Sequence, residues 1–362
     1  MTMKMNRRTM LAGTAAAAGI AGLGLPAMAQ GRRVTVIDGY PDRAMWVQEL
    51  SNFFLPEVNR RLAEMGLEPM DFQESYGGSI VRPRGVLEGM RLGLGDIGVV
   101  TTIFHSSTLP SQGIAAVTPF ISANAGLVAR SVDEIAMEFD AMRQEFEAQN
   151  QVYLATGVVL DSYQMFSSRP LNGLADLSNL KVAGAGYNLR YLEGLDGAVG
   201  VRGGLTDFYN MVQTGVVDAA MLWPEAANTF AIAEVAPYML RADLGAVNSK
   251  TLTVNKDFWN SLDPAVQGVL REVGILYRDR LAEVAMGRAA SSEAAYVAAG
   301  GTIVDLSASE RAQWAAAMPN IAVEWARGLD EDGKDGSGML RAYIDKLIAG
   351  GETPARNWAD EV

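Results

Sequence analysis

The stretch Leu180-Lys181-Val182-Ala183-Gly184-Ala185-Gly186, followed by Tyr187-Asn188-Leu189-Arg190, decides the fold. Apolar residues from Leu180 to Val182 predict a strand, the glycines predict a turn, and 188–195 predicts a helix. A second buried strand is predicted over Val216–Leu222, and it ends at Trp223-Pro224. Strands that alternate with helices indicate the α/β class.

The same alternation extends toward the N-terminus. Strands are predicted at 34–37, near 70–73 and at 97–103, and helices over roughly 45–64 and 83–91. Two Ser-x-x-Glu sequences, at 131–134 and 307–310, match the capping box that begins a helix.

A long helix is predicted from Asp263-Pro264, because Asp is a favoured cap and Pro is favoured in the first turn. Apart from three isolated glycines, no helix-breaking residue follows until Gly300-Gly301. A helix of this length is expected to touch more than one domain. At roughly 150 residues per domain, 362 residues suggest about two domains.

The composition excludes several chemistries. The chain has no Cys and one His, so a disulfide, a Cys nucleophile, an iron–sulfur cluster or a multi-His metal site is not expected. With 30 Lys+Arg against 42 Asp+Glu, the formal net charge is −12, which argues against binding a nucleic-acid backbone. We therefore expect no metal, no cofactor and no nucleic-acid partner.

Residues 1–29 have the features of an export signal. Arg7-Arg8 precedes an apolar run rich in Ala and Gly, which ends at Ala27-Met28-Ala29. A basic start, a short apolar middle and a small-x-small ending are typical of a cleaved signal, and adjacent arginines resemble the twin-arginine type. The alternative is a membrane anchor, for which the run is short. The expected location is the periplasm.

The glycine turn before Arg190 is a candidate anion site. Backbone N–H groups at a helix N-terminus attract an anion, and Arg190 could supply a paired charge, with Tyr187 and Asn188 adding hydrogen-bonding groups. The alternative is a simple tight turn, with Arg190 on the surface.

Other candidate ligand-binding residues follow predicted strands. In open α/β sheets, ligands bind beyond the carboxyl ends of strands. The residues in such positions are Trp223, Glu225, Tyr40, Thr101, Phe104 and Tyr163. An ordinary core position remains the alternative for Trp223, and the single His105 is expected to be structural.

The sequence Gly93-Leu94-Gly95-Asp96-Ile97-Gly98 matches the dinucleotide pattern G-x-G-x-x-G. That pattern requires a strand before it and a helix after it, whereas here the predicted order is reversed. We interpret it as a helix-to-strand turn. No pairing of a nucleophile with a base is evident from spacing.

Several segments, in this order, resemble the TRAP solute-binding proteins, the dicarboxylate-type receptors of tripartite ATP-independent periplasmic transporters. Leu174–Val182 is similar to their DLKGLK strand, and Phe208–Asp218 to their YxALQxGxVDG segment. Val254–Trp259 is similar to their NxxxW segment, and Gly95–Gly98 to their GxxDIG turn. The resemblance covers essentially the whole chain after the signal.

The resemblance implies a two-domain periplasmic binding protein of type II-like architecture, with hinge strands and a long domain-spanning helix. The implied division is 30–155 plus about 243–285 for domain I, and 156–242 plus about 286–362 for domain II. A monomer would close over a small organic acid and deliver it to the membrane permease. The implied function is transport, not catalysis.

One departure from the family concerns charge. Members usually carry an Arg two residues after the Lys of the strand motif, where this chain has Ala183. Either Arg190 replaces it, or backbone donors hold the anion, or the ligand is not a typical carboxylate. The aromatic Trp223 near the family's polar position favours a ring or apolar body on the ligand. The alternatives are an enzyme exported by the twin-arginine route and a structural envelope protein.

Overall fold

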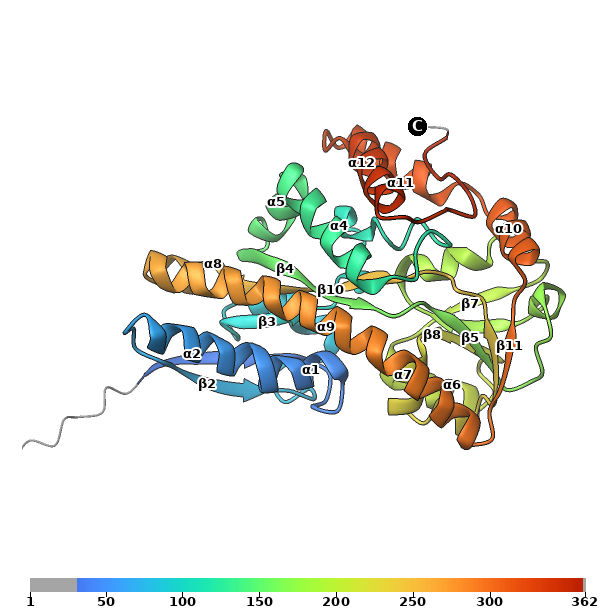
Figure 1. Cartoon of the computed structure of the whole chain (residues 1–362), viewed down its shortest axis with the longest axis horizontal. Coiled ribbons are helices and arrows are strands. Elements are labelled where there is room, and N and C mark those ends of the chain that lie inside the picture. The colour runs from blue at the N-terminus through green and yellow to red at the C-terminus, as the bar shows by residue number, and fades with distance from the viewer. Residues whose placement is uncertain (1–30, 361–362) are drawn as a thin grey trace, which may run out of the picture.

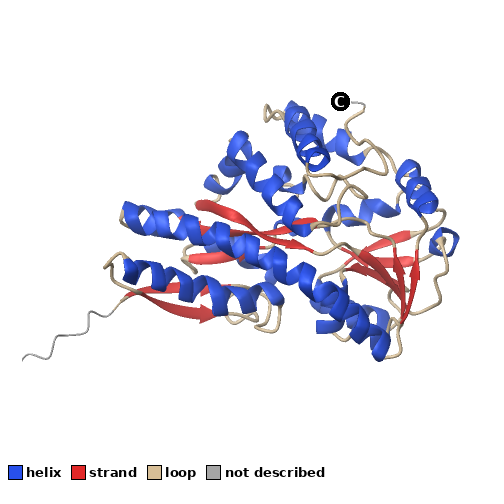
Figure 2. Cartoon of the chain, viewed as in Figure 1, coloured by secondary structure: helices blue, strands red, loops and turns tan. Residues whose placement is uncertain are grey.

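The computed structural model describes residues 31–360, which form two lobes, each built on one β-sheet (Figures 1 and 2). In the first sheet β2, β1 and β3 are parallel, and β10 is antiparallel to both β3 and β4. The strands, in sheet order, are β2 (Met70–Ser75), β1 (Arg32–Ile37), β3 (Ile97–Val100), β10 (Val247–Asn255) and β4 (Gln151–Leu160).

The second sheet is also mixed. The strand β5 is antiparallel to β8 and β9, while β6 is parallel to β7 and β8, and β9 is parallel to β11. In sheet order the strands are β11 (Thr302–Asp305), β9 (Tyr238–Arg241), β5 (Gln164–Ser167), β8 (Ala219–Leu222), β6 (Lys181–Gly184) and β7 (Val199–Arg202).

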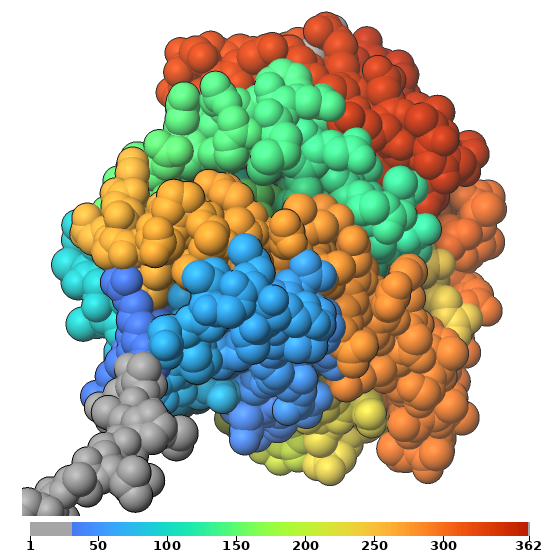
Figure 3. All heavy atoms as spheres, turned by 60° about the vertical axis from the view of Figure 1, so that its left-hand side comes forward, coloured from blue at the N-terminus to red at the C-terminus, as the bar shows by residue number. Residues whose placement is uncertain are grey.

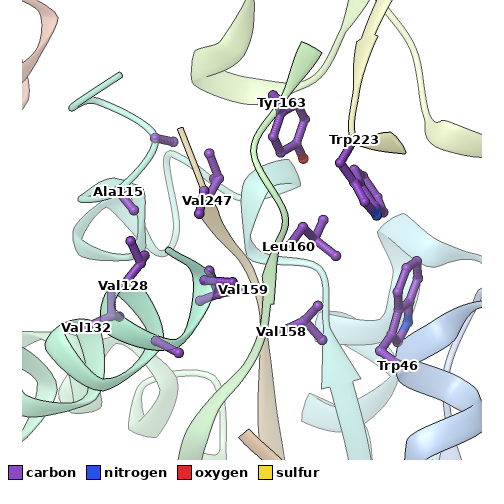
Figure 4. Close-up of a cluster of buried hydrophobic side chains, with 14 of the residues drawn as sticks. Trp46, Ala115, Val128, Val132, Val158, Val159, Leu160, Tyr163, Trp223 and Val247 are labelled. Atoms are coloured by element: carbon purple, nitrogen blue, oxygen red, sulfur yellow. The ribbon is translucent and has the colours of Figure 1, made fainter. Parts of the chain in front are cut away.

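The chain crosses between the sheets from β4 to β5 and from β9 to β10, and the two crossings are hydrogen-bonded to each other. The Leu244 N–H donates to the Tyr163 carbonyl at 3.0 Å, and the Tyr163 N–H donates to the Gly245 carbonyl at 3.2 Å. In Figure 4, Val158 and Leu160 point toward the side of Trp46 and Trp223, while Val159 points away from them. The alternation of a strand therefore lets β4 pack on both faces.

Helices cover both sheets. Those of residues 31–260 are α1 (Met45–Glu49), α2 (Leu55–Glu64), α3 (Val86–Arg91), α4 (Ala125–Glu138), α5 (Ala141–Glu147), α6 (Leu205–Gln213), α7 (Pro224–Thr229) and α8 (Lys256–Asn260). The C-terminal ones are α9 (Pro264–Ala298), α10 (Ala308–Ala317), α11 (Ile321–Glu331) and α12 (Gly336–Ala349).

The helix α9 confirms the prediction of a long helix that touches both lobes. It packs against β4, α4 and α2 of the first lobe and against α7 and β11 of the second. Its Tyr277 hydroxyl donates to the Trp46 carbonyl at 2.8 Å, and its Tyr296 hydroxyl donates to the Ala236 carbonyl at 2.6 Å. Figure 3 shows α9 as an orange band between the blue N-terminal and green segments.

Four local predictions differ from the structure. The strand predicted over Val216–Leu222 begins only at Ala219. Ser131 lies inside α4, whose first N–H groups are capped by Asn124 instead, so the sequence at 131–134 is not a helix start. The strand predicted over 97–103 ends at Val100, and a 3₁₀ turn follows. The helix predicted over 188–195 is a 3₁₀ helix at Gly186–Leu192. The capping box at Ser307 and Glu310 is confirmed.

Candidate functional site

A small cavity lies between the two lobes, and we call it the inner cavity. Residues that follow β1 and β3 of the first sheet line one side of it, and residues that follow β6 and β8 of the second line the other. Its volume is about 30 Å³, which leaves room for about two water molecules. The apolar part of its wall is Ile103, Leu160, Ala185, Leu205, Phe208 and Met221.

Six of the nine residues singled out from the sequence line the inner cavity. They are Tyr40, Thr101, Phe104, Tyr163, Asn188 and Trp223. The rings of Tyr163 and Trp223 lie 5.6 Å apart, and those of Tyr40 and Trp46 lie 4.9 Å apart in an edge-on arrangement. Aromatic rings thus form much of the wall, as the strand-end positions suggested.

Two polar side chains of the wall make no close hydrogen bond in the described chain: the Thr101 hydroxyl and the Asn188 amide, each in a residue that is only 1% exposed. Burial raises the pKa of Tyr163, and a weak hydrogen bond with Asn188 opposes that rise, so of the two only Thr101 is without any partner. A buried polar group without a partner costs stability, so such groups call for a bound molecule. Both groups can hydrogen-bond a ligand.

Among residues 31–360, Lys250 on β10 is the only one with a charged side chain that lines the inner cavity. It is 3% exposed, and its Nζ lies 3.9 Å from the Trp46 ring centroid and 5.2 Å from that of Tyr40. Burial lowers the pKa of Lys250, an effect that the negative charge of Asp38 opposes. Cation–π contact compensates in part for the ammonium's lost hydration.

Asp38 lies beyond the end of β1 and is also buried. Its two oxygens accept the Tyr40 N–H at 2.7 Å and the Trp46 indole N–H at 3.0 Å. Burial raises the pKa of Asp38, while these hydrogen bonds and Lys250 lower it. Asp38 therefore orients the Trp46 ring against Lys250. Its negative charge also balances the positive charge of Lys250, although the two groups form no ion pair at contact distance.

Glu225 holds Trp223 and does not itself line the inner cavity. One of its carboxylate oxygens accepts the Trp223 indole N–H at 3.2 Å, and the other accepts the Thr229 hydroxyl at 2.8 Å. The guanidinium of Arg288 lies 3.9 Å away. These contacts fix the orientation of the Trp223 ring, which lines the inner cavity.

Arg190 and Tyr187 lie outside the inner cavity. The Arg190 guanidinium pairs with Glu193 at 2.8 Å and Glu324 at 2.6 Å, at the surface. Tyr187 lines a separate space of about 10 Å³. His105 lines neither space, and burial lowers its pKa to about 4, with help from Arg84.

The glycine turn itself does face the inner cavity, through Ala185. Gly186 has a φ of +55°, and a Cβ there would lie 2.5 Å from the Ile103 carbonyl oxygen, so only glycine fits. The helix that follows is a 3₁₀ helix of seven residues. Such a short 3₁₀ helix has only a small dipole. It therefore attracts an anion much less than the α-helix that was predicted at this place.

A wider opening of about 610 Å³ adjoins the inner cavity, because Tyr40 and Phe104 line both. Its rim carries Arg43, Arg82 and Arg84 from the first lobe, and Asp207 from the second. Arg84 lies over the Phe104 ring at 4.5 Å from its centroid. We call this second space the outer opening.

The model of the family described as "Bacterial extracellular solute-binding protein, family 7" matches residues 62–327, well over half of the chain. The chain belongs to this family. The match confirms the resemblance found in the sequence, and it favours a receptor over an exported enzyme.

Solved structures share the fold of this family 7 protein. A TRAP protein from Rhodoferax ferrireducens with copurified benzoate is 18% identical, with a TM-score of 0.78 over 88% of this chain and 98% of that one. A Bordetella bronchiseptica protein with bound mandelate is 15% identical, with a TM-score of 0.77 over 88% and 99%. One from Desulfovibrio salexigens is 20% identical, with a TM-score of 0.74 over 88% and 96%.

Sequence reasoning missed Lys250, Asp38 and Trp46 in this solute-binding protein. A signal existed for Lys250, because it stands inside the β-prone run Ser249-Lys250-Thr251-Leu252-Thr253-Val254. A lysine in a strand that is buried along its whole length is rare unless it is paired or functional. No comparable signal marks Asp38 or Trp46.

Proposed function

We propose that this chain is the extracytoplasmic receptor of a TRAP transporter and captures a small organic acid with an aromatic or apolar body. The observation that carries the proposal is the inner cavity between the lobes, whose walls are aromatic and apolar but also present the unpartnered Thr101 hydroxyl and the weakly bonded Asn188 amide. Apolar walls with a few placed polar groups are typical of small-molecule sites.

The proteins of similar fold support an acid as ligand. Their structures contain benzoate, mandelate, pyroglutamate and galacturonate. Among these, the flat rings of benzoate and mandelate suit the walls formed by Tyr163, Trp223 and Phe208 best. Rings that meet edge to face or offset add to the free energy of burial.

A thermal-shift screen with these acids tests the proposal. A ligand held only by the folded state stabilises it by about 2.7 kcal/mol at 100 times its dissociation constant, enough to raise the melting temperature by several degrees. We expect the largest rise with an aromatic acid, and the matched alcohols serve as controls. No rise with any acid at millimolar concentration would contradict the proposal.

The ligand is proposed to enter by separation of the lobes, because a cavity of about 30 Å³ cannot admit a six-membered ring. The hinge segments would be 161–163 and 242–246, close to the expected domain boundaries at 155/156 and 242/243. The C-terminal segment contacts both lobes, since α12 packs on α4 and α10 packs on the turn at Leu174–Leu177. Small-angle scattering should show a larger radius of gyration without ligand, and identical curves would contradict hinged closure.

The receptor is proposed to act in the periplasm and to dock on the permease of its transporter. No helix within residues 31–360 has the length and apolarity needed to cross a bilayer. The export signal expected at 1–29 lies outside the described residues. Sequencing of periplasmic protein should give Gln30 as the first residue, and an intact Met1 on cytosolic protein would contradict export.

A further inference from the structure

We propose that Lys250 is the cation that pairs with the carboxylate of the ligand, and that the site is built for a monocarboxylate with a flat apolar body. This inference rests on the proposed function and names the charge and shape of its ligand. It also places the anion anchor on the first lobe, whereas the sequence pointed to Arg190 on the second.

The ammonium of Lys250 has hydrogen-bonding capacity to spare. It has three donors, yet within residues 31–360 it makes one hydrogen bond, to the Ser249 hydroxyl at 3.3 Å. The rings of Trp46 and Tyr40 cover other sides of it. A carboxylate in the inner cavity could accept the remaining N–H bonds.

The Asp38 carboxylate does not accept the free N–H groups of Lys250. Its oxygens accept the Tyr40 N–H and the Trp46 indole N–H, one on each, and these bonds direct the carboxylate toward α1. No ion pair within 4.0 Å joins it to Lys250, although its charge acts on the lysine through the low-dielectric interior. The lysine is therefore kept available for an anion from the cavity side.

The opposite wall complements this anchor. The unpartnered Thr101 hydroxyl and the Asn188 amide, which is bonded only weakly to Tyr163, come from different lobes and line the same cavity as Lys250. Ala183 provides no charge on β6, and the Arg190 guanidinium is occupied by two glutamates. An acid bound to Lys250 could thus hydrogen-bond to both lobes and hold them closed.

The wall also limits the ligand to one negative charge. No second cation from the described part of the chain lines the inner cavity, and the arginines of the outer opening lie at its rim. A second carboxylate would lie against side chains such as Leu160, Met221 and Phe208, where an unpaired charge is costly. The ring of an aromatic acid, in contrast, fits such a wall.

The test compares acids with their uncharged isosteres by titration calorimetry: benzoate with benzamide, and phenylacetate with phenylacetamide. We expect the wild-type protein to bind at least one acid 30-fold or more tightly than its amide. A loss of affinity on this order is expected when one partner of a buried, hydrogen-bonded charge pair is removed. Lys250→Met should reduce that ratio to within a few-fold, and Lys250→Arg should recover part of it. Lys256→Met, an exposed lysine just past the same strand, is the matched control and should behave as wild type.

Each outcome separates this inference from the proposed function. Equal binding of acid and amide by the wild-type protein would overturn the role of Lys250 without reliance on any variant. Unchanged acid affinity in a folded Lys250→Met protein would do the same. Tighter binding of phthalate or succinate than of every monocarboxylate would overturn the inference that the ligand carries one negative charge. Binding of no acid at all by the wild type would overturn the proposed function itself, and this inference with it.

Discussion

The Nζ atom of Lys250 lies 3.9 Å from the centroid of the Trp46 ring, so a lysine of β10 and a tryptophan of α1 form one buried unit. Three contacts fix that tryptophan: its indole N–H donates to Asp38, its carbonyl accepts the Tyr277 hydroxyl, and its ring lies 6.5 Å from that of Trp223. The long helix α9 thus positions the cavity wall through Tyr277.

Thr101→Val should separate ligand binding from folding. The Thr101 hydroxyl has no partner in the described chain, so its replacement by a methyl group should leave the free energy of unfolding unchanged or slightly higher. If the hydroxyl bonds the ligand, affinity for the acid should fall about fivefold, or about 1 kcal/mol. Urea denaturation without ligand and calorimetry with it measure the two effects. Loss of stability with unchanged affinity would contradict the prediction.

Binding of an acid should be accompanied by proton uptake. Burial lowers the pKa of Lys250 to about 7, and a bound carboxylate would raise it again. Burial also raises the pKa of Asp38 to about 7, so both groups lose a proton as the pH rises through this range. The free site therefore becomes less positive, and affinity should fall by about tenfold per pH unit for each proton taken up.

Calorimetry in phosphate and in Tris measures this uptake, because the two buffers differ in protonation enthalpy. We expect more protons to be taken up at pH 8 than at pH 6, and less uptake in Lys250→Arg, whose guanidinium stays charged. A dissociation constant that is the same from pH 6 to 9, with equal heats in both buffers, would show that Lys250 stays charged throughout.

Much of the fold could be predicted from the sequence because it depends on local patterns. The strands around Val34, Val182 and Met221 are short apolar runs between turn residues, and the helix from Pro264 has a clear start and no breaker. The mistaken helix start at Ser131 shows the limit of this approach. The pattern Ser-x-x-Glu is present, but tertiary packing continues α4 through it from Asn124.

The site was predictable only in part. Strand-end positions pointed to Tyr40, Tyr163 and Trp223, because carboxyl ends of parallel strands meet at one edge. Lys250 lies inside β10, a strand antiparallel to both of its neighbours, and not beyond the carboxyl end of a strand, so the same rule could not find it. Its role depends on a tryptophan about two hundred positions away in the sequence, which no local pattern reveals.

The buried ion pair of Asp133 and Arg278 should dominate the attachment of α4 to α9. The two groups are 2.7 Å apart, and their side chains are only 9% and 10% exposed. Arg278→Met would leave the carboxylate buried without its cation, at a cost of about 3–5 kcal/mol in the free energy of unfolding. Arg91→Met, in an exposed pair with Glu88, is the control and should change the free energy of unfolding very little, because water and salt screen such a pair. Urea denaturation distinguishes the two, and a similar small loss in both would contradict the prediction.

Arg190→Ala should leave ligand affinity nearly unchanged, in contrast to Lys250→Met. The Arg190 guanidinium binds Glu193 and Glu324, whose side chains are 45% and 53% exposed, and it does not line the inner cavity. Pairs this exposed contribute under about 1 kcal/mol to stability, because water and salt screen them. Calorimetry with the acid found in the screen gives the dissociation constant of both variants. A loss of 30-fold or more in Arg190→Ala would instead mean that the guanidinium leaves its two glutamates and turns into the cleft when ligand binds. In that case the anion anchor would lie on the second lobe, as the glycine turn in the sequence first suggested, and Lys250 would serve to balance Asp38.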